Sequence, residues 1–183
     1  MEASDGAATH IDVMCIGDLI NNPPEAFHYS YKRTDASGAV DKEADITPQK
    51  MNITITDTAG SHSYQGVRSD DVSWNSAVLD LSGLNLTKMS ATLDFLNNSS
   101  ALTRETSEAL NGYPTTKYAI DTASANSSDK KKFETLFGKG SFEKGTVSVA
   151  ADGCAVQLVL DEGLWQNDGS IGKDHYEIAR IKK

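Results

Sequence analysis

The residues of this sequence that could bind a metal or transfer protons are scattered along the chain. No two of the four histidines have the i, i+2 or i, i+4 spacing of a local metal-binding pair: His10, His28, His62 and His175. The acidic pairs Asp70-Asp71 and Asp161-Glu162 supply the groups that glycosidases use, but adjacent residues of a strand point to opposite faces. We therefore expect no metal site and no cofactor. A hydrolase remains an alternative if carboxylates distant in sequence meet across a cleft.

Two glycine-containing segments have the composition of catalytic motifs without their order. The segment from Gly60 to Gly66 reads GSHSYQG, which is not the G-x-S-x-G of a nucleophile elbow. The segment from Gly138 to Ser141 reads GKGS, and it lacks the spacing of a phosphate-binding loop and follows a predicted helix. The first segment therefore does not indicate a serine hydrolase, and the second is typical of a helix C-terminus.

The two cysteines are far apart in the sequence. Cys15 and Cys154 match neither a zinc-binding nor a thioredoxin-like spacing. We favour the interpretation that each is a small buried core residue, because free cysteines are commonly buried. A long-range disulfide between them is the alternative.

Composition excludes several classes of protein. The chain has 183 residues, a length typical of a single domain, and we expect one domain with about eight flexible residues at its N-terminus. A formal net charge of −9 disfavours nucleic acid as a partner, and no apolar run approaches the ~20 residues of a membrane span. The first ten residues lack the features of a signal peptide. The basic run from Lys130 to Lys132 lies beside Asp129 and Glu134, which is typical of a solvated helix face.

The hydrophobic pattern alternates with period two in several segments, which predicts strands. Aromatic residues alternate with polar ones from 27 to 31, and aliphatic residues do so from 51 to 55. Two hairpins are predicted at Asn111-Gly112 and Asp152-Gly153, because these pairs suit tight turns, and a last strand is predicted from 174 to 181.

Period 3.6 predicts helices at about 9–20, from residue 70 to about 81, and at 86–96. A further helix is predicted to begin between 127 and 129, to end at Gly138, and to bury Phe133, Leu136 and Phe137. Helices grouped between antiparallel runs of strands indicate an α+β domain built on a single curved antiparallel sheet.

The order of these elements carries a resemblance to a known family. Residues 108–121 read EALNGYPTTKYAID, a lysine-rich helix follows, and residues 145–156 read GTVSVAADGCAV. Together with a helix leading into FHYSY at 27–31, this order resembles the LolA/LppX-like bacterial lipoprotein-carrier superfamily. The resemblance implies an open half-barrel whose concave face is covered by helices, enclosing an apolar cavity for acyl chains. It also implies an extracytoplasmic protein without catalytic residues, often attached to lipid, although this sequence shows no lipobox cysteine.

We therefore expect a non-enzymatic binding or carrier protein of the periplasm or cell surface. Its expected partner is a lipid or the acyl chain of a lipoprotein; we also expect contact with a membrane surface, a monomeric state and no nucleic acid. The candidate lining residues are Phe27, Tyr29, Tyr31, Met51, Ile53, Ile55, Trp74, Val78, Leu93 and Leu96. The same side chains could instead fill an ordinary core. In that case the protein would be a structural or interaction module of the cell envelope that binds no small molecule.

Overall fold

The computed structural model describes residues 11, 26–35, 38–67, 92 and 94–181. These residues are mostly β, with two short helices: residues 92 and 94–97 are helical, and α4 is the longer helix. The elements with defined bounds are β1 (Ala26–Asp35), β2 (Gly38–Ile46), β3 (Lys50–Asp57), β4 (Gly60–Val67), β5 (Leu102–Leu110), β6 (Tyr113–Asp121), α4 (Ser127–Phe137), β7 (Phe142–Ala150), β8 (Ala155–Trp165) and β9 (Ile171–Ile181). No helix among the described residues is long and apolar enough to cross a bilayer.

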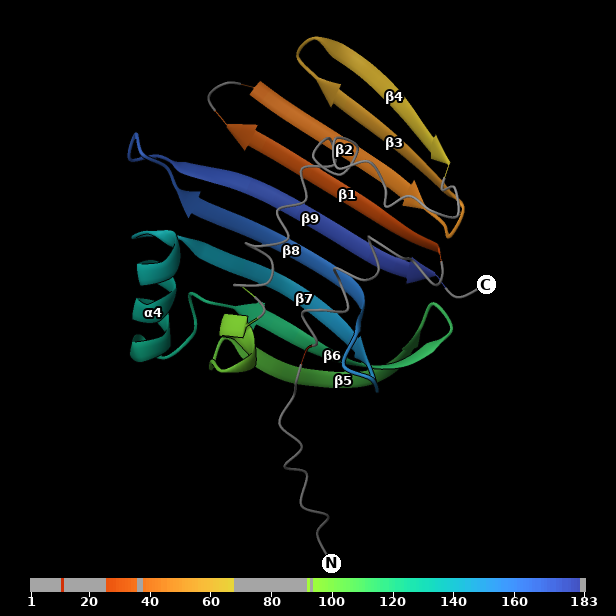
Figure 1. The fold of residues 1–183 in the computed structure, drawn as a ribbon. Helices are drawn as coiled ribbons and strands as arrows, with labels where there is room; N and C mark the ends of the chain where they lie inside the picture. Colours follow the sequence, from red (N-terminus) through yellow and green to blue (C-terminus); the bar gives the residue numbers. More distant parts are fainter. Residues whose placement is uncertain (1–10, 12–25, 36–37, 68–91, 93, 182–183) are drawn as a thin grey trace, which may run out of the picture.

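The strands form one nine-stranded antiparallel sheet in the order β4-β3-β2-β1-β9-β8-β7-β6-β5. Seven of the eight pairings join strands that are adjacent in sequence, through short connections or, in the case of β6 and β7, through α4. The first and last strands, β1 and β9, pair with each other near the middle of the sheet. The edges β4 and β5 lie at opposite ends of the sheet (Figure 1), so it does not close. This confirms the prediction of a single open antiparallel sheet.

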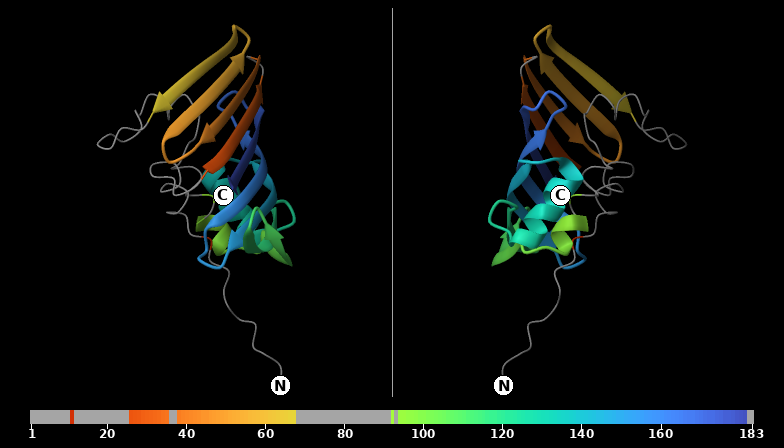
Figure 2. Two further views of the ribbon diagram at one scale, coloured as in Figure 1. Left: turned by 90° about the vertical axis from the view of Figure 1, so that its right-hand side faces the viewer. Right: turned by 90° about the vertical axis from the view of Figure 1, so that its left-hand side faces the viewer.

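The half-barrel curvature that the resemblance implies is not found. The sheet is twisted, but it is not strongly curled (Figure 2). Breaks in register, which bend strands, occur in two of its pairings. They lie between Arg104 and Ser107 on β5 and between Ser148 and Val149 on β7. The pairings of β1 to β4 and of β1 with β9 continue without a break. The N-terminal half of the sheet therefore lacks the irregularities that would bend it into a half-barrel.

One face of the sheet, which we call the apolar face, carries the core. Because side chains alternate along a strand, register partners on neighbouring strands share a face. One row of partners crosses the sheet from β3 to β6: Ile53, Ala44, Tyr29, Ile178, Leu158, Val147 and Tyr118. All but Tyr29, whose side chain lies outside the described part, are buried. The predicted alternation from 51 to 55 is confirmed, since Met51, Ile53 and Ile55 are all buried.

The opposite face is polar and carries paired charges. Histidine His28 contacts Asp45 across β1 and β2, with 2.7 Å between Nδ1 and Oδ1. On the neighbouring strands, His175 lies between two carboxylates, with Nδ1 2.7 Å from Asp161 and Nε2 3.0 Å from Glu177. A sheet with one apolar and one charged face packs on one side and faces water on the other.

The predicted turns lie at the ends of the strands. The β5–β6 hairpin turns at Asn111 and Gly112, whose φ angles of 51° and 84° are both positive, as a type I′ turn requires. The β7–β8 hairpin turns through Asp152 and Gly153, where the Asp152 carboxylate accepts a hydrogen bond from the Cys154 backbone N–H. Strand β9 begins at Ile171, three residues earlier than predicted. Both hairpins were therefore correctly located from local turn chemistry.

The favoured interpretation is correct for the burial of Cys154 and wrong for its thiol, which is not free. Cys154 is buried beside the β7–β8 turn and is bonded in a disulfide. The sequence contains one other cysteine, Cys15, which lies outside the described residues. The alternative prediction was a long-range bond from Cys154 to Cys15, at positions 139 residues apart. Spacing alone could not identify it, because a disulfide depends on the distance between Cα atoms.

Close packing of β7 against β8 gives a testable difference between two glycines. A Cβ on Gly145 would collide with the backbone carbonyl of Val159, whereas a Cβ on Gly163 would meet the Phe142 ring. A ring can rotate away, but the backbone of a central strand pair cannot move without breaking its ladder. We expect Gly145→Ala to lower the free energy of unfolding by about 2–3 kcal/mol, and Gly163→Ala by about 1 kcal/mol or less. Urea denaturation measures both, and equal losses would contradict the packing argument.

Candidate ligand groove at helix α4

A groove of about 690 Å³ opens between α4 and the short helix at residues 92–97. Its volume is within the range of about 300–1,000 Å³ typical of sites for small ligands. The described lining residues are Asp94, Phe95, Ser128, Lys131, Lys132, Thr135 and Leu136. Both helices lie at the end of the sheet where β6 ends and β7 begins (Figure 1).

The α4 residues of the groove form one stripe along the helix. They occupy positions 128, 131, 132, 135 and 136, which repeat at three and four residues and so share one side of an α-helix. The stripe carries apolar atoms from Leu136 and from the methylene stems of the two lysines. Phe95 contributes a ring from the opposite helix. The groove therefore has an apolar floor with charged groups at its margin.

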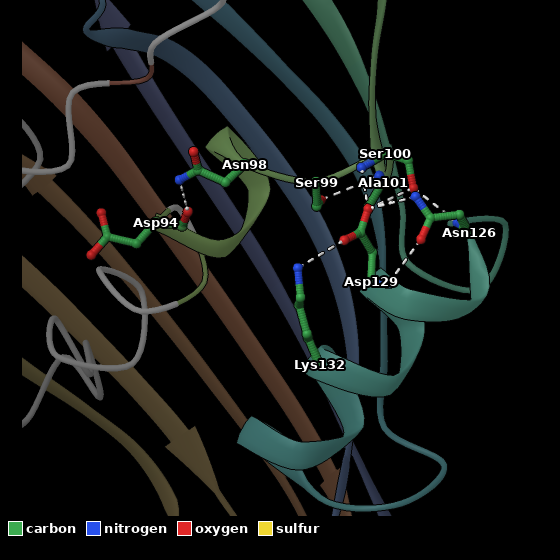
Figure 3. A network of polar contacts seen from close by, with 8 residues as sticks. All are labelled: Asp94, Asn98, Ser99, Ser100, Ala101, Asn126, Asp129 and Lys132. Atoms are coloured by element: carbon green, nitrogen blue, oxygen red, sulfur yellow. Dashed lines mark hydrogen bonds and ion pairs between the residues drawn. The ribbon is translucent and has the colours of Figure 1, made fainter.

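A polar network holds the N-terminus of α4 in place (Figure 3). Asn126 is the N-cap, and its side chain accepts a hydrogen bond of 2.9 Å from the Asp129 N–H. The Asp129 carboxylate in turn accepts bonds from the Ser100 N–H at 2.8 Å, the Ser100 hydroxyl at 2.9 Å and the Asn126 amide at 2.9 Å. Lys132 Nζ lies 3.6 Å from the same carboxylate. The network ties α4 to the segment that joins the short helix to β5.

This network predicts an acid sensitivity of α4. Hydrogen bonds from Ser100 to the Asp129 carboxylate lower its pKa below the ordinary 3.8. A lowered pKa adds stability that is present above pH 3.8 and is lost as the pH falls through the folded-state pKa. We expect Asp129→Asn to reduce the loss of stability between pH 5 and pH 2.5, measured by urea denaturation. Asp94→Asn is the matched control, because the Asp94 side chain forms no hydrogen bond with the described residues, and an equal effect would argue against the network.

Aromatic packing fixes the other side of α4. The buried Phe133 ring has its centroid 5.3 Å from that of Phe95 and 4.7 Å from that of Phe137. These tilted arrangements are the ones that aromatic pairs prefer. Phe95 both packs against Phe133 and lines the groove, so the aromatic trio that holds α4 also sets one wall of the groove.

The short helix is anchored independently of α4. Its Thr92 hydroxyl donates a buried hydrogen bond of 3.0 Å to Glu143 on β7. The Asn97 side chain forms two hydrogen bonds with the backbone of the buried residue Ile11. Its Oδ1 accepts from the Ile11 N–H at 2.8 Å, and its Nδ2 donates to the Ile11 carbonyl at 2.9 Å. Because buried polar groups are costly to leave unpaired, these bonds hold Asp94 and Phe95 at a defined distance from the sheet. Both walls of the groove are therefore attached to β7 or to the segment before β5.

No known protein-family model matches the chain, and no curated protein is significantly similar to it. What the structure shares with the expectation from the carrier superfamily is a single, open antiparallel sheet. A family assignment does not follow from that architecture, because one fold supports many functions.

The predicted lining residues are not the residues that line this groove. Tyr31, Met51, Ile53, Ile55 and Leu96 belong to the buried core, and the first four lie on the apolar face. Phe27 and Tyr29 lie on β1, but their side chains are outside the described part, as are the whole residues Trp74, Val78 and Leu93. The role of these residues in acyl binding stays a prediction.

Two glutamates are neighbours in register on the apolar face, and both are buried: Glu143 on β7 and Glu162 on β8. Asp174 continues the row on β9 and accepts a hydrogen bond of 3.2 Å from the Tyr31 hydroxyl. Burial and the nearby Asp174 carboxylate raise the pKa of Tyr31 above its ordinary value of 10. Among the described lining residues of the groove, Asp94 is the one carboxylate.

The sequence analysis missed the groove because it assigned two of its features to other roles. Leu136 was predicted to be buried, yet its side chain is 59% exposed at the groove. The lysines at 131 and 132 were interpreted as a solvated face; they are indeed exposed, and they also line the groove. A usable signal was present: on an α-helix Lys132 and Leu136 stand one turn apart, which places an apolar residue among the charged ones.

Proposed function

We propose that this protein is a non-enzymatic, extracytoplasmic binding or carrier protein for the acyl chain of a lipid or lipoprotein, and that the groove at α4 holds the chain. The observation that carries the proposal is the exposed leucine in an apolar-floored groove. Soluble proteins rarely leave a contiguous apolar surface open to water without a function. Here Leu136 and Phe95 both line a space of ligand size.

The energetics of acyl binding suit such a groove. Each methylene removed from water contributes about 0.8 kcal/mol, so a chain that buries about ten methylenes gains roughly 8 kcal/mol before the costs of association. No bond is made or broken, and the groove opens to solvent, so the chain can enter and leave. These are the properties of a carrier that binds and releases its cargo.

The disulfide supports the proposed compartment. Structural disulfides form and persist in oxidising environments such as the periplasm and the cell surface, and are rare in the cytosol. Cys154 is bonded in this structure. The bond therefore favours an extracytoplasmic location over a cytosolic one.

A second candidate is a structural or interaction module of the cell envelope with a filled core. The complete burial of Met51, Ile53 and Leu96 favours it, because side chains with no exposed surface leave no space for a ligand at their own positions. Under this alternative the groove at α4 would hold no lipid. The two candidates therefore make opposite predictions for the same experiment.

The test is the binding of a neutral apolar fluorophore, N-phenyl-1-naphthylamine, to the full chain after organic extraction and refolding. We expect saturable binding, and we expect Leu136→Asp to weaken it about tenfold, because the substitution places a charge against the chain. Trp165→Ser is the matched control, since Trp165 is the other large apolar residue exposed among the described residues, at 44%, and does not line the groove. Absence of saturable binding, or equal losses in the two variants, would favour the module.

A further inference from the structure

We infer that the ligand of the α4 groove is a single-chain amphiphile with an anionic head group, whose charge is held by Lys131 with Lys132 beside it. This inference rests on the proposed function and specifies the class of ligand. It follows from the charges along the groove, from the partners that those charges already have, and from the length of the apolar stripe.

The two lysines of the groove are not equivalent. The Lys132 ammonium lies 3.6 Å from the buried Asp129 carboxylate, in the network that holds the N-terminus of α4. The Lys131 ammonium forms no hydrogen bond or ion pair with the described part of the chain; the Thr135 hydroxyl bonds only its backbone carbonyl. Among the described lining residues, Lys131 is therefore the cation that a ligand can engage without displacing a described partner.

The position of Lys131 suits an amphiphile. The stem of a lysine side chain packs along apolar surface while its ammonium group reaches water. Lys131 lies near the middle of the stripe, and Leu136 follows it by five residues toward the C-terminus of α4. A chain lying against Leu136 and Phe95 would bring its head group to the ammonium at the margin of the groove.

The local charge differs in sign from that of the whole molecule. The chain carries a net charge of −9, so an anion is repelled by most of its surface. The described lining carries two lysines and one aspartate, which gives a local balance of +1. The lysines therefore attract a carboxylate head group at this groove. They repel a quaternary ammonium head group.

The length of the stripe suits one chain of moderate length. Position 136 is eight residues after position 128, which corresponds to about 12 Å along the axis of an α-helix. At about 1.3 Å per carbon, estimated from a carbon–carbon bond of about 1.5 Å, this length covers about nine carbons. Probes with twelve carbons would fill the stripe and leave the head group outside it.

The experiment compares three probes with the same twelve-carbon chain by isothermal titration calorimetry, with the ionic probes below their micellar concentrations and dodecan-1-ol below its solubility limit. Laurate is anionic, dodecan-1-ol is neutral and dodecyltrimethylammonium is cationic. We expect laurate to bind about fivefold more tightly than dodecan-1-ol, the effect of one solvent-accessible ion pair, and dodecyltrimethylammonium to bind most weakly. Equal affinities for laurate and dodecan-1-ol would overturn the inference while leaving the proposed function intact. Failure of all three probes to bind would instead overturn the proposed function.

A pair of variants assigns the effect to a residue. Lys131→Gln should remove the preference for laurate, so that the affinities of this variant for laurate and dodecan-1-ol agree within about twofold. Lys130→Gln is the matched control, because Lys130 is an exposed neighbour on α4 that does not line the groove. If Lys130→Gln reduces laurate binding as much as Lys131→Gln does, the effect reflects general charge and the assignment of Lys131 is wrong.

Discussion

Replacing Phe133 by alanine is expected to lower the free energy of unfolding by about 3–5 kcal/mol, the range for removal of a buried aromatic ring. The Phe133 side chain is 1% exposed and contacts the rings of Phe95 and Phe137. Its loss would leave a cavity between α4 and the short helix. Because Phe95 lines the groove, the same variant should also weaken binding of N-phenyl-1-naphthylamine. Urea denaturation and fluorescence titration measure the two effects.

The control for Phe133→Ala is a residue on the exposed side of the same helix. Leu136→Ala truncates an apolar side chain that is largely exposed, so we expect a loss of about 0.5 kcal/mol or less. If the two variants lose similar stability, α4 is not held by the aromatic trio. A large loss confined to Phe133→Ala would show that the groove depends on this packing.

Removing the disulfide should have the second large effect. A bond between Cys154 and the other cysteine, Cys15, would close a loop of about 140 residues and restrict the unfolded chain. On the chain-entropy model, loops of this length are stabilised by up to about 5 kcal/mol, and typical measured values are 2–4 kcal/mol. We expect the double variant Cys15→Ser, Cys154→Ser to lose about 3–5 kcal/mol in urea denaturation.

Electrophoresis tests the same bond directly. The unaltered chain should migrate faster without reductant than with it, because the closed loop makes the denatured chain more compact. The double variant should migrate identically under both conditions. Free thiols that react with iodoacetamide in non-reduced, denatured protein would contradict the disulfide and, with it, the support that it gives to an extracytoplasmic location.

Local patterns predicted the elements whose causes are local. The alternation at Met51, Ile53 and Ile55 placed these residues correctly on a buried face, because the side-chain period of a strand is two wherever the strand lies. The Asn111-Gly112 turn was located correctly, because its positive φ angles depend on those two residues. Helix α4 was predicted to end at Gly138, which is its C-cap.

The groove could not be predicted in the same way. Whether Leu136 is buried depends on what packs against its side of α4, and the helix packs through Phe133 on another side. The role of Asp129 depends on Ser100, which is 29 residues earlier in the sequence. Neither relation leaves a periodic signal, because each joins residues that meet only after the strands have paired.

The strands, the turns and the apolar side of strands such as β3 follow from local sequence patterns, because backbone geometry and hydrophobic period act within a few residues. The pairing of β1 with β9, the open and weakly curled sheet, and the groove between α4 and the short helix are visible only in the folded chain. These features depend on contacts between residues tens to more than a hundred positions apart, and the free energy of such contacts belongs to the packed chain rather than to any one segment.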